Sequence, residues 1–366
     1  MISFGMSEEQ ELIRDTLREF ANEAMRSIAR DCDETAQIPQ DFLDSVWELG
    51  LTNTQIAEQY GGGGEERSPV TNAILLEELG FGDVALAIAA TAPNAFVNAI
   101  VDHGTDEQKQ TLLPLFCGES FQVASLAVLE HGPLADPAAP LTKAEPKGGN
   151  GFVLSGTKSW VVFGDRASHF LVFARNNGDV DAFIVPSDAE GLTISEPEKN
   201  VGLRGLTTVS IELERVAVGP EAKLGGTQGC NARAILDASR AAHAAILVGA
   251  CRGVLEFCVP YTKDRIAFDE PIAKKQSIAF RLAEMHMEVE AMRWMTWKTA
   301  SHISQGHEDS TRQAHLTRQY VSEKAMWIAD NGIQVFGGHG FIREYPVEMW
   351  FRNVRTLTVL EALAGV

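Results

Sequence analysis

The chain has 366 residues, 45% of them apolar, which is more than one hydrophobic core usually organises, so two or three domains are expected. Its 50 Asp and Glu residues outnumber its 31 Lys and Arg residues and give a formal net charge of −19. A surface this acidic repels phosphate backbones, which excludes nucleic acid as an expected partner.

The first segment, residues 1–120, is predicted to form a helical domain. Residues 8–24 place apolar side chains at helical spacing behind Ser7, a residue type that often caps helices. A glycine run at 61–64 is the largest interruption, and the turn at 104–106 precedes a second amphipathic stretch at 107–115. These patterns predict several helices separated by turns.

The middle segment, residues 121–228, is predicted to form a compact antiparallel β domain, a barrel or a sandwich. Short runs rich in β-branched and aromatic residues are separated by Gly, Asn and Asp turns, without helical patterns between them. The run at 209–213 alternates with period two, as a half-buried strand does. The predicted strands cover residues 152–154, 160–163, 169–173, 182–185 and 209–213.

The last segment, residues 229–366, returns to helical texture and is predicted to form a bundle. Its apolar residues recur with a spacing of four, three, four and three, which suits a seam between packed helices. The residues with this spacing are Ile278, Leu282, Met285, Val289 and Met292. The predicted order of the chain is therefore helical, β and helical.

The cysteines and the chain start favour a reducing compartment. The five cysteines are widely spread and form no Cys-x-x-Cys pair, so neither a disulfide framework nor a zinc ribbon is expected. The acidic, amphipathic start lacks the pattern of a signal peptide, and no apolar run approaches the roughly 20 residues that span a bilayer. We expect a cytoplasmic protein with no membrane association.

Several common catalytic motifs are absent from the sequence. It contains no His-Glu-x-x-His helix, no Gly-x-Ser-x-Gly elbow, no Walker loop and no Gly-x-Gly-x-x-Gly after a strand. The segment Glu284-Met285-His286 has the wrong offset for the Glu-x-x-His pairs of a di-iron bundle. We therefore expect no metal site.

Three C-terminal motifs are more specific. They are residues 261–272 (YTKDRIAFDEPI) followed by Gln276, residues 334–341 (QVFGGHGF) and residues 344–348 (EYPVE). Together with GTKSW at 156–160 and GLRG at 202–205, they resemble the acyl-CoA dehydrogenase family over nearly the whole chain. The resemblance implies an N-terminal helical domain, a middle β domain and a C-terminal four-helix bundle. It also implies FAD as cofactor and assembly as a homotetramer or dimer.

The resemblance also implies a cofactor site. Arg265 matches the family position that pairs with the FAD pyrophosphate, a task that suits the fixed donors of a guanidinium. Trp160 matches a tryptophan that packs near the flavin ring. Val162 stands where relatives have a hydroxyl that reaches the flavin N5 edge, and a valine side chain donates no hydrogen bond. The other matching positions, beside or along the dinucleotide, are Phe268, Gln276, Gln334, Gly337 and Gly338.

The substrate side of the expected site comes from two segments. Residues 129–136 take the place of the family's Thr-Glu-Pro-x-Ala-Gly-Ser-Asp loop; they retain Glu130 but show Ala135 where a hydroxyl is usual. Asp237 and Arg240 match positions that touch the CoA part of the ligand, although Arg240 could equally be a structural ion-pair residue.

Glu361 aligns with the carboxylate that serves as base in most of the family. Removing the weakly acidic α-proton of an acyl thioester, while the β-hydride leaves for flavin N5, requires a base close to that carbon. The resemblance thus implies oxidation of an acyl-CoA to a trans-2-enoyl-CoA, with electron-transfer flavoprotein or a similar acceptor taking the electrons. Relatives follow this glutamate with Gly-Thr and a further helix, where residues 362–366 here read ALAGV.

Two alternatives stay open at this stage. The tail, Val162 and Ala135 are compatible with a non-catalytic or half-active subunit of a heteromeric dehydrogenase. The same fold could also serve a flavin oxidase or monooxygenase, in which oxygen reacts at the reduced flavin.

Overall fold

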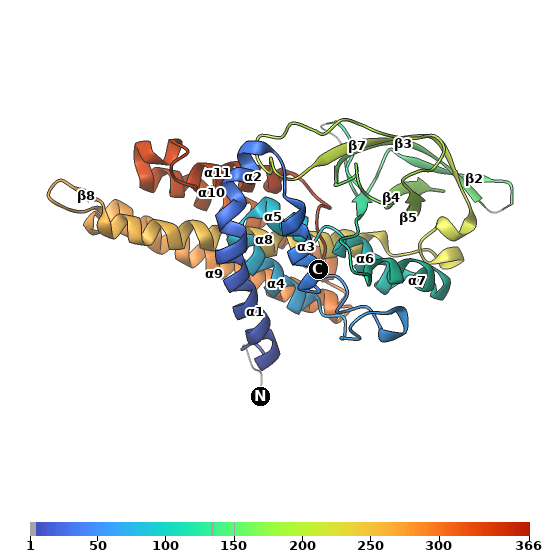
Figure 1. The fold of residues 1–366 in the computed structure, drawn as a ribbon, viewed down its shortest axis with the longest axis horizontal. Helices are drawn as coiled ribbons and strands as arrows, with labels where there is room; N and C mark the ends of the chain where they lie inside the picture. The colour runs from blue at the N-terminus through green and yellow to red at the C-terminus, as the bar shows by residue number, and fades with distance from the viewer. Residues whose placement is uncertain (1–4, 133–134, 150) are drawn as a thin grey trace.

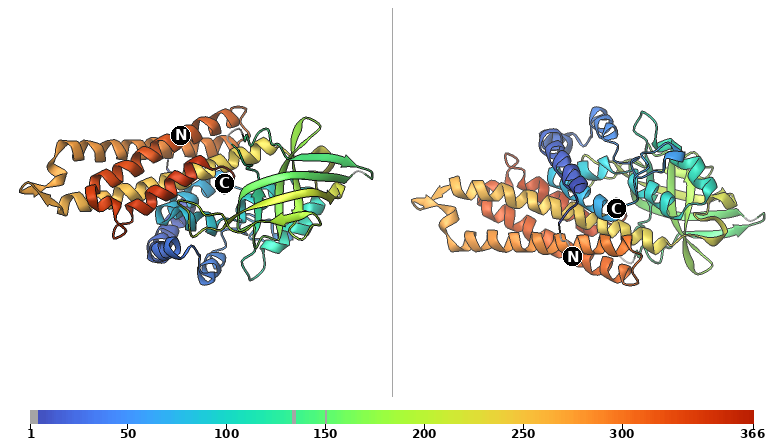
Figure 2. Two further views of the ribbon diagram at one scale, coloured as in Figure 1. Left: turned by 90° about the horizontal axis from the view of Figure 1, so that it is seen from above. Right: turned by 90° about the horizontal axis from the view of Figure 1, so that it is seen from below.

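The computed structural model describes residues 5–132, 135–149 and 151–366 (Figure 1). A β-sheet forms one end of the molecule, long helices run away from it toward the other end, and the N-terminal helices cross the middle. The two further views in Figure 2 show the same arrangement. The predicted order of helical, β and helical segments is confirmed.

The N-terminal part is built from helices with short connections. Helix α1 begins as predicted behind Ser7, whose side chain accepts a hydrogen bond from the Gln10 amide while the Gln10 side chain bonds back to Ser7. A π-helical turn, Ala21–Met25, joins α1 to α2. The helices are α1 (Glu8–Phe20), α2 (Arg26–Thr35), α3 (Gln40–Glu48), α4 (Pro69–Gly82), α5 (Val84–Ala90), α6 (Asn94–His103) and α7 (Asp106–Leu112).

The middle part forms a seven-stranded sheet in the order β1-β4-β2-β3-β7-β6, with β5 paired to β4. It is mixed rather than wholly antiparallel, because β1 runs parallel to β4, with Ala124 opposite His169. Long chain segments separate these two strands, as a parallel pair requires. The strands are β1 (Ala124–Ala127), β2 (Lys143–Lys147), β3 (Gly151–Val162), β4 (His169–Asn176), β5 (Asp179–Pro186), β6 (Leu192–Ile194) and β7 (Thr208–Val218).

The C-terminal part is a bundle of four helices: α8 (Ala232–Asp264), α9 (Gln276–Ser304), α10 (Ser310–Phe336) and α11 (Val347–Val359). The predicted seam is confirmed on α9, where Met285, Val289 and Met292 are buried and Leu282 packs against the core. A small hairpin, β8 (Ile266–Ala267) and β9 (Glu270–Pro271), joins α8 to α9 at the tip of the bundle farthest from the sheet (Figure 1).

Helix α8 is the central element of the molecule. Among the described residues it is the single continuous helix long and apolar enough to cross a membrane, and 83% of that stretch is buried inside the protein, as is typical of a core helix. It crosses α4 with almost no space between the backbones. A Cβ atom at Gly249 would collide with the carbonyl oxygen of Glu77, and one at Gly80 would collide with that of Ile246. Both positions therefore require glycine.

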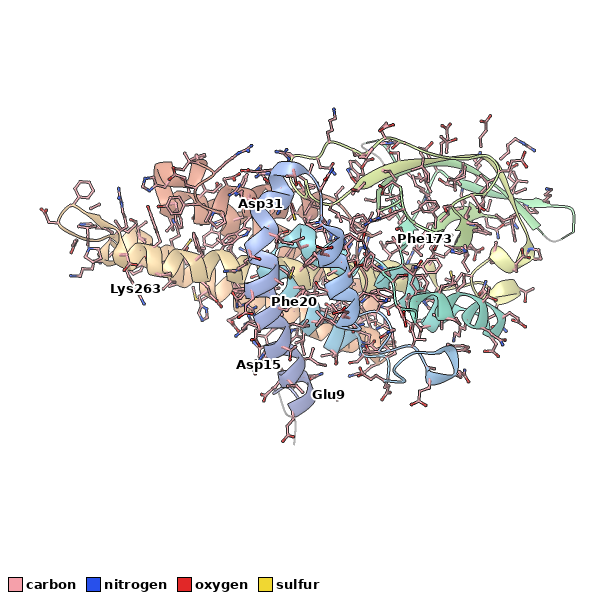
Figure 3. All side chains as sticks on the ribbon, in the orientation of Figure 1. Glu9, Asp15, Phe20, Asp31, Phe173 and Lys263 are labelled. Atoms are coloured by element: carbon pink, nitrogen blue, oxygen red, sulfur yellow. The ribbon has the colours of Figure 1, made fainter. Side chains whose placement is uncertain are left out.

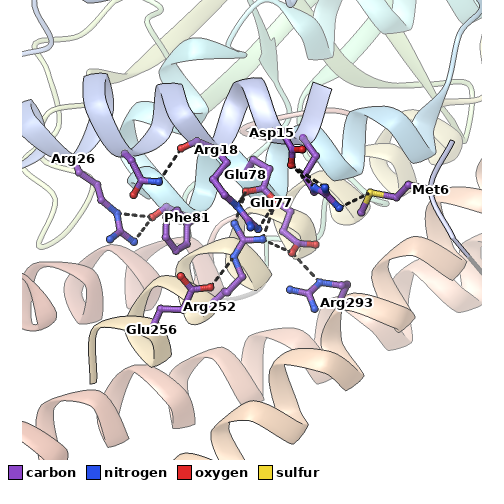
Figure 4. A network of polar contacts seen from close by, with 12 residues as sticks. Met6, Asp15, Arg18, Arg26, Glu77, Glu78, Phe81, Arg252, Glu256 and Arg293 are labelled. Carbon is purple, nitrogen blue, oxygen red and sulfur yellow. Dashed lines mark hydrogen bonds and ion pairs between the residues drawn. The ribbon is translucent and has the colours of Figure 1, made fainter. Parts of the chain in front are cut away.

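A network of charged side chains joins four helices beside this crossing (Figure 4). The carboxylate of Glu78 on α4 forms ion pairs with Arg18 of α1 at 3.2 Å and with Arg252 of α8 at 2.5 Å. The carboxylate of Glu77 forms ion pairs with Arg252 at 3.1 Å and with Arg293 of α9 at 2.9 Å. Burial raises the pKa of Glu77, and the two arginines oppose this effect. We call these five residues the ionic network.

A second set of contacts docks the sheet onto the bundle. The Leu203 amide donates to the Asn353 side chain of α11 at 2.7 Å, and the Gly202 amide donates to Thr356 at 3.1 Å. Asn353 also donates to Asp83 at 3.0 Å, and Asp83 caps α5 through two backbone amides. The loop before β7 is thereby fixed to α11 and α5.

Candidate active site

Glu361 lies just beyond the end of α11, between the bundle and the sheet. Its side chain is 20% exposed, and its carboxylate forms ion pairs with Arg240 of α8 at 3.2 Å and with Arg318 of α10 at 3.9 Å. Arg318 also donates to the carbonyl oxygen of Leu360 at 2.7 Å. Two arginines from different helices thus hold the predicted base from both sides.

The backbone that follows Glu361 is held as well. Ala362 adopts a left-handed conformation with φ of 61°, which is uncommon for a residue other than glycine. The next amide, of Leu363, donates to Nε2 of the fully buried His243 at 3.0 Å. Burial, reinforced by Arg318, lowers the pKa of His243 to about 3, so its imidazole is neutral near pH 7. Since Nε2 accepts, the ring proton is assigned to Nδ1.

Several buried polar atoms near this carboxylate form no hydrogen bond, although two of them, Asp237 Oδ1 and Arg318 Nε, lie within ion-pair distance of Arg240 and Glu361. Buried side-chain polar atoms in proteins almost always have a hydrogen-bond partner, so a group of exceptions calls for an explanation, such as strain, a bound water or a ligand. Twelve such atoms occur in the described part of the chain, and five belong to this neighbourhood. They are Asp237 Oδ1, Ser239 Oγ, Arg240 Nε, His243 Nδ1 and Arg318 Nε. We call these residues, with Glu361, the Glu361 cluster.

Asp237 lies behind Arg240 in the interior. It is 2% exposed, accepts a hydrogen bond from Thr311 at 2.6 Å and lies 3.6 Å from Arg240. Burial raises its pKa, and the bond from Thr311 opposes this. The structure therefore brings together the predicted residues Asp237, Arg240 and Glu361.

Two cavities flank the first turns of α8, and their linings include Leu236 and Ala238, the sequence neighbours of Asp237, but no residue of the Glu361 cluster. A polar cavity of about 640 Å³ is lined by Asn231 and Arg233 of α8, Lys223, and Pro137 of the loop after β1. A smaller cavity of about 340 Å³ is lined mainly by small and apolar residues. These include Ala95, Ala99, Leu126, Ala234, Ile235 and Ala238.

The predicted flavin-ring residues lie on β3. Trp160 is half-buried and its indole donates to the Asn200 side chain at 3.3 Å. Val162 is buried, and its carbonyl oxygen accepts a bond from Ser125 at 2.5 Å. The Val162 side chain therefore belongs to the core of the β domain.

Glu130 holds the loop that follows β1. Its carboxylate accepts bonds from the Leu141 amide at 2.6 Å, from the Thr142 amide and hydroxyl at 2.8 and 2.6 Å, and from Lys158 at 2.8 Å. Burial alone raises the pKa of Glu130, but Lys158 and Thr142 outweigh it and lower the value. Ala135, half-buried in the same loop, donates its amide to Gly132 at 3.2 Å. The bonds of Glu130 to protein atoms thus close the ends of the loop.

The predicted dinucleotide residues lie elsewhere, on the bundle. Arg265 follows α8, Phe268 is 88% exposed at the hairpin tip and Gln276 begins α9. Tyr261 stacks on Phe336 at 3.8 Å, which brings the end of α10, with the exposed Gln334, Gly337 and Gly338, to the same region. No atom lies within 4 Å of a Cβ built at either glycine. Figure 1 shows this end opposite the sheet, so one chain does not join these residues to Trp160.

Sequence reasoning missed three residues here: His243, Arg318 and Asn200. His243 interrupts an apolar run on α8, residues 241–248, and a lone polar residue in such a run is a usable signal. Arg318 and Asn200 carry no comparable signal, because their contacts with Glu361 and Trp160 join residues some 40 positions apart. Figure 3 shows the side chains of the described residues as sticks on the ribbon.

Comparison with known proteins identifies the family. Residues 7–119, 125–216 and 229–361 match the N-terminal, middle and C-terminal domains of acyl-CoA dehydrogenase. The chain is 32% identical to the probable acyl-CoA dehydrogenase YngJ of Bacillus subtilis, covering 100% of this chain and 97% of that one.

Two solved structures are similar over almost their full length. Butyryl-CoA dehydrogenase from Megasphaera elsdenii superposes with a TM-score of 0.88 at 26% identity, covering 98% of this chain and 95% of that one. The prolyl acyl carrier protein oxidase AnaB gives a TM-score of 0.86 at 26% identity, covering 96% and 95%. The chain therefore belongs to the acyl-CoA dehydrogenase family of FAD-dependent oxidoreductases.

Proposed function

We propose that this protein oxidises an acyl-CoA thioester to the trans-2-enoyl-CoA, with Glu361 as the base that takes the α-proton. The observation that carries the proposal is the Glu361 cluster. A carboxylate held by Arg240 and Arg318 sits among buried polar atoms that form no hydrogen bond, at the junction of bundle and sheet. A weakly acidic proton demands a base in fixed geometry, and these contacts supply it.

The two cavities suit the two parts of such a substrate. The polar cavity suits the phosphate-bearing part of CoA through Arg233, whereas Lys223 in the same lining is paired with Asp181 at 3.0 Å. The apolar cavity beside Ala238 suits an acyl group. The linings of the two cavities reach Leu236 and Ala238, on either side of Asp237 in the sequence, and Asp237 lies 3.6 Å from Arg240, which holds the proposed base.

The residues present fit FAD on one condition, that two chains contribute. Gly337 and Gly338 leave open space beside their backbone, and Arg265 and Phe268 are exposed near them, as a dinucleotide site requires. Bound FAD supplies the two-electron acceptor for the β-hydrogen. Because Trp160 lies at the far end of the same chain, we propose that Arg265, Phe268, Gln276 and Gln334 hold the adenosine diphosphate part of FAD bound to a second copy.

The assembly is accordingly proposed to be a homodimer or homotetramer. We further propose electron-transfer flavoprotein or a similar protein as electron acceptor, and a cytoplasmic location. The five free thiols and the acidic surface support that location.

The experiment is anaerobic stopped-flow absorbance of the FAD-loaded protein mixed with a panel of acyl-CoAs. The wild type is expected to bleach with at least one of them. Glu361→Gln is expected to retain the yellow colour and bleach at least about 10³-fold more slowly, because the proton has no acceptor. Glu19→Gln, an exposed carboxylate on α1 away from the residues proposed to hold substrate or FAD, is the matched control. Bleaching of Glu361→Gln at the wild-type rate would contradict the proposal.

A second candidate is an oxidase on the same fold. The similarity to AnaB and the absence of a side-chain hydroxyl at Val162 favour it. Aerobic turnover with stoichiometric hydrogen peroxide, measured with a peroxidase-coupled dye, distinguishes the oxidase from a dehydrogenase that requires a protein acceptor.

A further inference from the structure

Trp160 has an unusual backbone conformation. Its φ is +51°, in the left-handed region, which bulky L residues seldom occupy. The pairing of β3 with β7 slips at this point, from Lys158 opposite Ile211 to Val161 opposite Val209, so that two residues of β3 face the single residue Ser210. Such a β-bulge re-aims a side chain, and it persists where surrounding contacts hold it.

Glu198 supplies these contacts. Its Oε1 accepts bonds from the Trp160 amide at 3.3 Å and from the Ser210 hydroxyl at 2.9 Å. Its Oε2 accepts a bond from the Thr208 hydroxyl at 2.9 Å. One carboxylate thus joins both strands of the bulge, and bonds to an ionised acceptor are stronger than those between neutral groups.

The indole is held by the same loop. Asn200, two residues after Glu198, accepts from Trp160 Nε1 at 3.3 Å and donates to the fully buried Thr208 at 2.9 Å. Thr208 in turn donates to Glu198. The backbone amide and the ring nitrogen of Trp160 are therefore both bonded to one hydrogen-bond network, formed by Glu198, Asn200 and Thr208.

His131 links the loop after β1 to this set. Its Nε2 lies 3.0 Å from the Ser210 hydroxyl, which already donates to Glu198, so Nε2 is assigned as the donor. Its ring lies 6.1 Å from that of Trp160. Loop 129–136 and the tryptophan therefore share one anchor.

We propose that Glu198 is a positioning residue, which with Asn200 holds Trp160 on its bulge and presents the indole to the flavin. The presentation of the indole to the flavin rests on the proposed function. The hold on Trp160 concerns the chain alone, so the two are tested separately.

The test uses full-length protein labelled with 5-fluorotryptophan and observed by fluorine NMR. The chain has six tryptophans, and Trp160→Phe identifies the resonance of Trp160. Glu198→Ala is expected to shift and broaden that resonance while the other five stay in place. It is also expected to weaken FAD binding about tenfold, measured by titration. Glu198→Gln keeps one acceptor oxygen and is expected to restore most of the wild-type signal.

Glu196→Ala is the matched control, because Glu196 is exposed in the same loop and its recorded hydrogen bond uses the backbone oxygen. If Glu198→Ala fails to fold, Asn200→Ala repeats the test through the indole alone. An unmoved Trp160 resonance in the folded variant overturns the proposal. A moved resonance in a protein that binds no FAD supports the hold on Trp160 and refutes the proposed function instead.

Discussion

Helix α8 carries two groups of buried charges that differ in how completely they are paired. The ionic network centres on Arg252 and the Glu361 cluster on Arg240, 12 residues earlier, or about 18 Å along the helix. Within the described residues, one buried side-chain atom of the ionic network, Arg252 Nε, forms no hydrogen bond, and it lies 3.8 Å from the Glu256 carboxylate. The Glu361 cluster is defined by five such atoms, of which Asp237 Oδ1 and Arg318 Nε lie within ion-pair distance of Arg240 and Glu361. Arginine side chains on one helix thus differ in how completely the buried groups around them are hydrogen-bonded.

The difference teaches where to look for chemistry. A buried charge is costly unless it is paired, and the ionic network meets that demand with protein atoms alone. In the Glu361 cluster more of the buried atoms lack a hydrogen bond to protein, which supports the proposal that it is the site. The completeness of hydrogen bonding, rather than charge or burial alone, distinguishes the ionic network from the proposed site around Glu361.

The largest expected effect on stability comes from breaking the ionic network. Arg252→Met removes the cation shared by Glu77 and Glu78 and is expected to lower the free energy of unfolding by about 3 kcal/mol, measured by urea denaturation. Glu256→Gln is the control, because this carboxylate is 54% exposed and 3.8 Å from Arg252, and its loss is expected to be within about 0.5 kcal/mol. Equal effects of the two changes would argue against the network as scaffold.

The matched change in the Glu361 cluster is Arg240→Met. Its cost in stability is expected to be less than half that of Arg252→Met, because Glu361 is partly exposed and keeps Arg318, and the buried Asp237 keeps its bond from Thr311. Acyl-CoA-dependent bleaching is expected to slow about 10²-fold, because Glu361 loses a fixed position. A large loss of stability with unchanged bleaching would reverse the comparison.

The smallest expected effect is a pH dependence from His243. Its pKa in the folded protein, about 3, lies below the usual value of 6.5, so between these values the unfolded chain binds a proton that the folded chain does not. Stability is therefore lost as the pH falls below 6.5, by up to about 1.4 kcal/mol per pH unit. The measurement is urea unfolding at pH 7 and pH 5.5.

Replacement of this histidine supplies the comparison. His243→Gln keeps an oxygen that accepts from Leu363 but does not titrate, so its stability is expected to fall about 1 kcal/mol less than that of the wild type over this range. His315→Gln, at an exposed position, is expected to follow the wild type. Parallel losses in His243→Gln and the wild type would show that His243 is not the group responsible.

Much of the fold was accessible from sequence because its signals are local. The Ser7 cap depends on a residue three positions away, and the α9 seam depends on spacing within one helix. The parallel pairing of β1 with β4 was not predicted, because it depends on which strands meet after a long connection. The local residue pattern predicts where strands occur, but it does not predict which strands pair with each other.

The site was accessible only in part for the same reason. The resemblance pointed to Glu361, Arg240 and Asp237, and the structure brings these three together. It did not point to Arg318 or His243, which act through contacts between distant helices. It assigned Glu130 to the substrate, whereas the structure shows that carboxylate bonded to protein donors; a direct contact with substrate stays a prediction.

The close crossing of α4 and α8 limits which substitutions this chain can accept. With no room for even a methyl group at Gly80 or Gly249, a larger residue at either position has to wedge the two helices apart. Such a wedge would also displace Glu77, Glu78 and Arg252, which lie beside the crossing, and through the rigid rod of α8 it would tilt Arg240. Loss of activity can therefore arise from a mutation at a glycine that no ligand ever touches.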